Sequence, residues 1–576
     1  MSLSISLNAS LTAMMTAQYN IAVSSANIAN ADTDGYTTKS AQNQAQIIGG
    51  KAVGVQSGNL TSAIDQRLFE SLVTSATELG YASQLNGYFQ LTDQYFGSVS
   101  GDNTLSEFIS GLETALSQWA VDPSSSSYQY DTVQKMAAMV DGLHSLSSSI
   151  QSQRADADED IEKTVGSINE LLSDIDDLNE QINVAKAVGS PTADLEDQRN
   201  TALLKLSEKM DVAHFTDSNG RLNVYTKSGT ALVTSNAHLL SYTATTSVTA
   251  SVTYPGGFDD ISVAGKNITE EIRGGELGAL VDLRDQELPA LQAELDELAT
   301  GLISAVNEIA NQGSAYPAPN NLSGTETVTA ADPFSGTGTV RIAVTASDGT
   351  VSGFSDINLG ALATVQDVID EINLIPGASA SVNADGVLEI TATGATDGIA
   401  INQMTSDVGG ESFSGYFGLN DIFTGTDASS LQLNSSLTAD PGRLPGGRLS
   451  DDAGLAVGDI GISSGDASNA QTLTNLFSTD QSFAAAGNLG AKSSSFAEYA
   501  SSIQSAMSLS VSDAASDKSL KTTLFGDLAD TMSSETGVNL DEEIARMNTY
   551  QQSYEAGAYV LKSVQELFDT LLNSVS

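Results

Sequence analysis

The chain has 576 residues, enough for about three or four domains, and 40% of them are hydrophobic, so cores can form. With 72 acidic residues against 23 Lys and Arg, the formal net charge is −49, which makes nucleic acid and anionic membranes poor partners. The absence of cysteine excludes disulfides, thiolate metal sites and cysteine nucleophiles, and no apolar run has the length needed to cross a bilayer.

The first predicted element is a helix over residues 3–30 that carries the alternating three- and four-residue spacing of a coiled-coil seam. Residues 1–31 contain neither a charged residue nor a histidine. A solvated helix carries charges on its outer face, so we expect this helix to be enclosed on most sides in the working protein; the alternative is a loose, low-complexity tail. The segment lacks the basic start and apolar centre of a cleavable signal peptide. The seam positions are Leu7, Leu11, Met14, Gln18, Ile21, Ser25 and Ile28.

A turn, an extended stretch and further helices are predicted up to residue 210. Gly35 suits a positive φ in the turn, and the polar stretch that follows, to about Asn59, is expected to be extended. Ser190-Pro191 is typical of an N-cap followed by the first helical residue, so we expect a helix to begin there after Gly189 ends the preceding one. The helices are predicted at residues 61–96, 105–119, 128–188 and 190–210.

Two β-rich segments interrupt the helical pattern. At His214 the apolar period changes from 3.6 to 2, which predicts a small β unit over residues 211–274. Over residues 313–446 the composition shifts to Gly, Thr, Ser and Asp, and we predict an inserted β-rich domain with a helix at 364–374 that leads into a hairpin.

Helices return between and after these segments. One is predicted over residues 281–309, with Pro289 marking a kink or a start, and another over 494–532. The last helix opens at Asn539, and Glu542 three residues later completes the pattern of a capping box. Its seam positions are Leu540, Ile544, Met547, Gln551, Tyr554, Ala558, Leu561, Gln565, Phe568, Leu572 and Val575.

These elements predict a multidomain α+β protein in which both chain ends form a long helical coiled-coil bundle, with β-rich outer domains inserted between them. An intramolecular coiled coil between the two ends is expected, but it leaves the outer face of the uncharged first helix without cover. Neighbouring copies would cover it, which predicts a polymer subunit. The predicted domains are residues 1–36 with 537–576 (terminal coiled coil), 37–210 with 275–312 and 487–536 (long-helix bundle), 211–274 (small β unit), 313–446 (outer domain) and 447–486 (connecting segment).

The two ends resemble a known family. The run Asn27-Ile28-Ala29-Asn30, followed by Thr33, Gly35 and Tyr36, is similar to the N-terminal signature of the bacterial flagellar axial proteins, the group of rod, hook and hook-associated proteins. The C-terminal run from Gly537 resembles the C-terminal signature of the same group, and its opening GVNLDEE is closest to the hook-associated members. The segments at 190–212 and 274–313 agree with them, and the segment at 364–390 resembles a small hook-type repeat found in flagellar outer domains.

The resemblance implies a structural adaptor between the flagellar hook and the filament, with no enzymatic activity and no cofactor. It implies neighbouring copies, the hook protein, hook-associated protein 3 and a dedicated export chaperone as partners, and no nucleic acid or membrane. It also implies an extracellular location on the flagellum after type III export without a cleavable signal. The polymerisation interface is predicted at Leu7, Leu11, Met14, Gln18, Ile21, Asn27, Ile28, Asn30, Thr33, Gly35, Tyr36, Leu540, Ile544, Met547, Gln551, Tyr554, Leu561, Phe568 and Leu572.

Two other functions stay open at this stage. The first is another axial subunit, such as a hook or distal rod protein. The second is an acidic secreted calcium-binding adhesin or enzyme. The chemical motifs are weak: the three histidines are far apart in sequence, and the acidic run at 156–160 lacks the glycine and the final glutamate of a calcium loop. The match GISSG at 461–465 has no histidine after it, so a nucleophile elbow is not expected.

Overall fold

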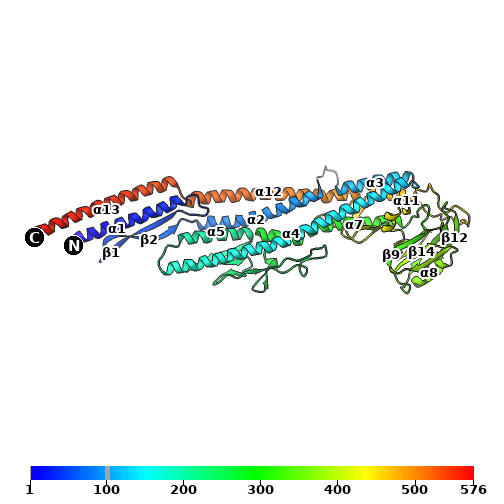
Figure 1. Ribbon diagram of the computed structural model, residues 1–576, viewed down its shortest axis with the longest axis horizontal. Coiled ribbons are helices and arrows are strands. Elements are labelled where there is room, and N and C mark those ends of the chain that lie inside the picture. Colours follow the sequence, from blue (N-terminus) through cyan, green and yellow to red (C-terminus); the bar gives the residue numbers. More distant parts are fainter. Residues whose placement is uncertain (1, 98–103, 576) are drawn as a thin grey trace.

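The computed structural model describes residues 2–97 and 104–575. The protein is an elongated rod with both chain ends at one tip and a β-rich domain at the other (Figure 1). At the first tip, helix α1 (Ser2–Ala29) packs along helix α13 (Leu540–Val575). A hairpin of strands β1 (Lys39–Ile48) and β2 (Lys51–Ser62) lies against α1. We call these four elements, with the turn at residues 30–38, the terminal tier.

Long helices form the middle of the rod and share one hydrophobic core. Pairs of these helices lie side by side: α2 with α12, α3 with α4, and α4 with α5. A π-helical turn at Leu283–Glu287 joins α6 to α7, and Pro289 lies in the first turn of α7, which confirms the predicted irregularity there. The helices are α2 (Gln66–Phe96), α3 (Leu105–Val121), α4 (Ser126–Ala187), α5 (Ala193–Lys209), α6 (Gly275–Asp282), α7 (Leu288–Ala310), α11 (Ser468–Ser478) and α12 (Phe496–Thr536).

The small β unit packs on α4, and its residues Leu222, Val224 and Leu240 belong to the long-helix core. Asn169 and Asn179 of α4 each bond the backbone N–H and C=O of one strand residue, Leu240 and Leu222 respectively, so amide side chains hold the two strand ends on the helix. The antiparallel strands are β3 (Val212–Thr216), β4 (Leu222–Thr226), β5 (Ala231–Val233), β6 (Leu240–Ser241), β7 (Ser262–Val263) and β8 (Lys266–Asn267), with a 3₁₀ turn at Thr269–Glu271.

The outer domain has a separate core that runs from Leu322 to Leu419. Two three-stranded antiparallel sheets, ordered β12-β11-β15 and β13-β14-β9, enclose it with α8. Thr364 and Asp367 form a reciprocal capping box at the start of α8. The elements are β9 (Asn321–Thr327), β10 (Gly336–Thr337), β11 (Thr339–Thr345), β12 (Val351–Asn358), α8 (Val365–Asn373), β13 (Ala378–Val382), β14 (Val387–Ala392), β15 (Gly398–Asn402), β16 (Asp407–Val408) and α9 (Phe413–Phe417), with a 3₁₀ turn at Leu359–Ala361.

The chain leaves the outer domain well before residue 446. Between Ile422 and Leu444 its apolar side chains, including Phe423 and Leu431, join the long-helix core. Further on, Leu449 and Ile462 pack against Ala343 and Ala400 of the outer-domain sheet. This return segment contains β17 (Phe423–Thr424), β18 (Gln432–Leu433), α10 (Ser435–Ala439) and a 3₁₀ turn at Pro441–Arg443, and strands β19 (Gln481–Phe483) and β20 (Lys492–Ser494) precede α12.

One local expectation from the sequence needs correction. The helix predicted to begin at Ser190 begins at Ala193, because Ser190 closes α4 instead: its N–H donates to Ala185 O at 2.8 Å, and Gly189 N–H donates to Lys186 O at 3.1 Å. That pair of bonds is a Schellman motif, which places Ser190 at the end of α4. The stretch expected to be extended is extended, as β1 and β2, and these strands pair with each other as a hairpin that was not predicted from the sequence.

Candidate polymerisation interface

Helix α13 uses only part of its predicted seam to contact α1. Met547, Tyr554 and Leu561 are half-buried, and Gly557 and Val564 are buried. Gly557 permits a close approach, because a Cβ there would lie 2.8 Å from Met14 Cγ of α1. Six other predicted seam positions are exposed in the lone chain: Leu540, Ile544, Gln551, Gln565, Phe568 and Leu572.

Helix α1 divides into a covered side and an uncharged open side. Leu7, Met14, Ile21 and Ile28 are half-buried, as expected of a seam, whereas Leu11 and Gln18 are exposed. The hairpin covers another face, where Asn8 donates to Val53 O and Val55 N–H donates to Thr12 Oγ1. The exposed residues follow three- and four-residue spacing and define what we call the open face of α1: Leu11, Met15, Gln18, Ala22 and Ser25.

The tip of α13 extends beyond α1. The helices are antiparallel, and with Gly557 beside Met14, α13 runs 18 residues further (557 to 575) whereas α1 runs only 12 back (14 to 2). Leu571 and Leu572 on this overhang are 56% and 69% exposed, and Leu567 and Phe568 just before it are 55% and 40% exposed. Large apolar side chains clustered in the open mark an interaction surface. The side chain of Val575 lies outside the described part of the structure.

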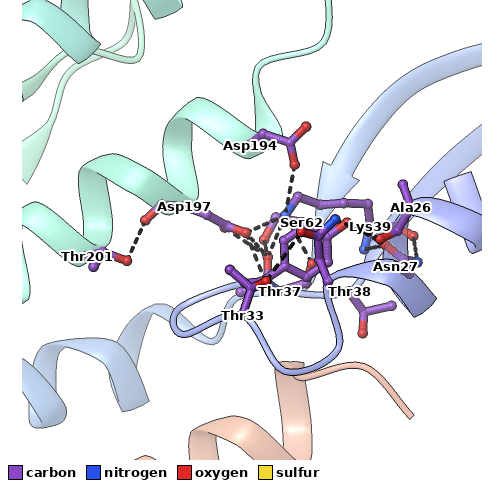
Figure 2. A network of polar contacts seen from close by, with 12 residues as sticks. Ala26, Asn27, Thr33, Thr37, Thr38, Lys39, Ser62, Asp194, Asp197 and Thr201 are labelled. Carbon is purple, nitrogen blue, oxygen red and sulfur yellow. Dashed lines mark hydrogen bonds and ion pairs between the residues drawn. The ribbon is translucent and has the colours of Figure 1, made fainter. Parts of the chain in front are cut away.

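The signature residues at the end of α1 form a hydrogen-bonded joint (Figure 2). Asn27 is fully buried: its Nδ2 donates to Lys39 O at 2.9 Å, and its Oδ1 accepts from Lys39 N at 3.1 Å and from the Tyr36 hydroxyl at 2.9 Å. One amide therefore fixes the angle between the helix and the first strand. Thr33 Oγ1 donates to Asn30 Oδ1 across the turn at 3.3 Å.

Gly35 lets the turn approach α5. Its φ is +73°, and an added Cβ would lie 2.3 Å from Thr201 Oγ1. Thr38 on the other side of the turn donates from its backbone to Thr536 O at 2.7 Å and from its hydroxyl to Gly537 O at 2.6 Å. The joint thus bonds to the connection between α12 and α13, and the two chain ends are positioned together.

The joint depends on one buried ion pair that the sequence did not point out. Lys39 is 2% exposed, pairs directly with Asp197 of α5 and lies 3.4 Å from Asp194. Thr37 N–H donates to Asp197 at 2.9 Å, and the Lys39 ammonium lies 3.8 Å from the centre of the Tyr36 ring. We call Thr37, Lys39 and Asp197 the clasp. The available signal was that Lys39 is the only Lys or Arg in the first 50 residues.

The clasp makes the joint a low-dielectric, acidic environment. Burial, followed by the negative charges of Asp194, Asp197 and Glu543, raises the pKa of Tyr36 to about 12. The Tyr36 hydroxyl therefore stays protonated at any physiological pH and continues to donate its hydrogen bond to Asn27 Oδ1. The signature residues thus position the terminal helices, and the exposed surfaces lie further out on α1 and α13.

Two further features of the described residues concern membrane-spanning helices and metal-binding groups. None of the helices within residues 2–97 and 104–575 combines the length and the apolar character needed to cross a bilayer. In the same residues, no group of three or more His, Asp or Glu side chains is arranged to hold a metal ion.

Three protein-family models match the chain, and together they span more than half of it. The model described as flagellar hook-associated protein FlgK helical domain matches residues 90–324. The flagella basal body rod protein model matches residues 7–37, which cover most of α1 and the turn after it. The flagellar basal body rod FlgEFG protein C-terminal model matches residues 530–574, which cover nearly all of α13.

Full-length relatives agree with these matches. Flagellar hook-associated protein 1 of Salmonella typhimurium (strain LT2) is 25% identical over 594 residues, covering 98% of this chain and 99% of that protein. Its counterpart in Escherichia coli (strain K12) is 25% identical over 596 residues with the same coverage. The solved structure of the flagellar hook junction protein FlgK from Burkholderia pseudomallei covers 80% of this chain and 99% of its own, with a TM-score of 0.51 at 16% identity, so that likeness is one of fold. Over almost its whole length the chain is therefore similar to flagellar hook-associated protein 1, and its helical middle matches the helical-domain model of that protein.

Proposed function

We propose that this protein is a structural adaptor subunit that joins the flagellar hook to the filament and polymerises through its terminal helices. One observation carries the proposal: the lone chain orders and pairs α1 and α13 but leaves the open face of α1 and the overhang of α13 uncovered. A buried joint holds these surfaces at a fixed angle to the long helices. Surfaces that are positioned but uncovered suit a subunit that other copies complete.

The partners follow from this role. Neighbouring copies cover the terminal tier, the hook protein lies on one side of the junction, and hook-associated protein 3 lies on the filament side. A dedicated chaperone protects the apolar overhang before type III export, which needs no cleavable signal. In the assembled junction, the terminal domain (residues 1–36 and 537–576) lines the inner wall, the long helices form the next layer and the β-rich domain faces outward.

Introducing a charged side chain on the overhang of α13 tests whether this surface takes part in assembly. Leu572 is 69% exposed, so Leu572→Asp leaves the stability of the free chain unchanged within about 0.5 kcal/mol, while it places a carboxylate in the assembly surface. The expected result is cells with hooks but without filaments beyond them, counted by electron microscopy. The matched control is Leu374→Asp on the outer domain, which is 74% exposed and should leave filaments intact.

Normal filaments on cells that express only the Leu572→Asp chain would contradict the role given to the overhang. Long tubes formed by the purified unmodified chain would instead favour a hook or rod subunit, since a junction adaptor stops after a limited number of copies.

A further inference from the structure

Arg199 on α5 is a buried cation with three of its five N–H donors unused by the described residues. It is 5% exposed, and its Nη1 donates to Asn179 Oδ1 at 3.0 Å and to Gly220 O at 2.8 Å. Its Nε is buried without a partner, and among the described residues Nη2 has no hydrogen bond and no carboxylate forms an ion pair with this side chain. A buried donor without a partner is costly, so the unused edge requires an explanation.

Two other buried arginines of this chain show what that edge is suited to. Arg284 donates from Nε and Nη2 to the two carboxylate oxygens of Asp285, both at 2.8 Å. Arg341 makes the same two-point contact with Asp356, at 2.6 Å and 2.9 Å. The Nε–Nη2 edge of a guanidinium matches the spacing of a carboxylate, and this edge is the part of Arg199 that lacks a partner.

Arg199 lines a cavity of about 520 Å³ that has room for a carboxylate side chain and part of its backbone. The end of β2, the α4–α5 turn and His214 of β3 form its other walls. Thr192 at the start of α5 makes no side-chain capping bond, so the helix N-terminus on this wall is also uncapped, and the buried Nε2 of His214 has no partner. Glu196 in the wall is already engaged, by Lys186 at 3.5 Å and by Thr192 Oγ1 at 3.0 Å.

We propose that this cavity is a docking site for a carboxylate, and that its occupant is an Asp or Glu side chain of a neighbouring copy in the polymer. The identity of the occupant rests on the adaptor function proposed above. Copies of this chain supply carboxylates in excess, with 72 Asp and Glu against 23 Lys and Arg. The cavity also borders the terminal tier through Ser62 of β2, so a carboxylate that reaches Arg199 comes from the level of the rod at which neighbouring copies pack.

Carbodiimide coupling tests the site, because it joins a lysine amine only to a carboxylate within ion-pair distance. In flagella isolated from cells that express the Arg199→Lys chain, we expect an amide bond from position 199 to an Asp or Glu of a second copy, identified by mass spectrometry of the digested product. The soluble, unassembled Arg199→Lys chain should give no such link between copies. The Arg199→Gln chain should give none in either state.

Three outcomes would overturn the proposal: no link at position 199 in the assembled chain, a link only to Glu196 of the same chain, or a link to a different protein. If Arg199→Lys does not fold, Thr216→Lys on the facing wall leaves Arg199 intact, and the same coupling should then join that position to a second copy. Antibody labelling of the same flagella separates the two hypotheses: label at the junction without a link refutes the docking site and leaves the adaptor function standing.

Discussion

The clasp at the joint provides the sharpest test of how the terminal tier is held. Asp197 accepts from Thr37 N–H at 2.9 Å and pairs with Lys39, which is 2% exposed. Replacing Asp197 by Ala leaves the buried ammonium with one carboxylate, Asp194 at 3.4 Å, and with the Thr37 carbonyl at 3.0 Å. Breaking a buried pair costs about 3–5 kcal/mol, and because Asp194 remains we expect the low end, about 3 kcal/mol.

The loss should be local, because the clasp joins the terminal tier to α5 and is not part of the long-helix core. Hydrogen exchange followed by mass spectrometry measures it: about 3 kcal/mol corresponds to roughly a 100-fold loss of protection in residues 2–62. Peptides from α4 should exchange as they do in the unmodified chain. The matched control is Asp194→Ala, whose side chain is 65% exposed and whose removal should cost less than about 1 kcal/mol.

Two results would refute this reasoning. Equal effects of Asp197→Ala and Asp194→Ala would show that burial does not determine the strength of the pair. Faster exchange throughout α4 in the Asp197→Ala chain would show that the terminal tier and the long helices unfold as one unit, so that the joint is not a local clasp.

Three further changes test other parts of the fold. Gly557→Val forces a side chain against Met14, which is 2.8 Å from the position of an added Cβ, and should weaken α1–α13 pairing by about 1–3 kcal/mol, seen as faster exchange in both helices. Burial raises the pKa of Glu294 to about 7. The buried carboxylate therefore destabilises the fold at high pH, and this cost is absent below the ordinary carboxyl range and grows as the pH rises to about 7. In denaturant titrations, Glu294→Gln should be more stable than the unmodified chain by up to about 3 kcal/mol at pH 8 and equally stable at pH 4. A gain that is the same at both pH values would contradict this. Arg284→Lys cannot reproduce the two-point contact with Asp285 and should lower the free energy of unfolding by about 3 kcal/mol, whereas an unchanged melting curve would show that the contact is dispensable.

The helices were predictable because long helices with one buried stripe leave a regular apolar period. Ile161, Ile168, Leu172 and Ile182 of α4 are all fully buried, as their spacing indicated. The β1–β2 hairpin was not recognised, because its residues are mostly polar and exposed and show no alternation. A strand pair without a buried face leaves little signal in the sequence.

The sequence predicted that α1 and α13 pair, but it did not predict which residues of α13 face α1. The helix α13 carries adjacent apolar stripes, and spacing alone cannot tell which one meets the partner within the chain. The contact itself is made where residues are small, with Gly557 against Ser10 and Met14, and small residues give no hydrophobic signal. The residues left over, such as Ile544 and Leu572, are those available to other copies.

The clasp and the unused edge of Arg199 could not be predicted, for a different reason. Lys39 and Asp197 are 158 residues apart, and although Lys39 is the only Lys or Arg in the first 50 residues, nothing in the sequence names its partner. Only the folded chain shows that one charge is buried against the other, and that Arg199 is buried without a carboxylate. The signature residues Asn27 and Tyr36 were identified by resemblance, and their role in fixing the joint comes from the structure.

Methionine oxidation tests most directly whether neighbouring copies cover the open face of α1. Met15 on that face is 62% exposed, and Met404 on the outer domain is 38% exposed, so both should oxidise readily in the free chain. In assembled flagella we predict that Met15 is protected at least about tenfold while Met404 oxidises as before. Oxidation of Met15 at the free-chain rate within the polymer would contradict the account.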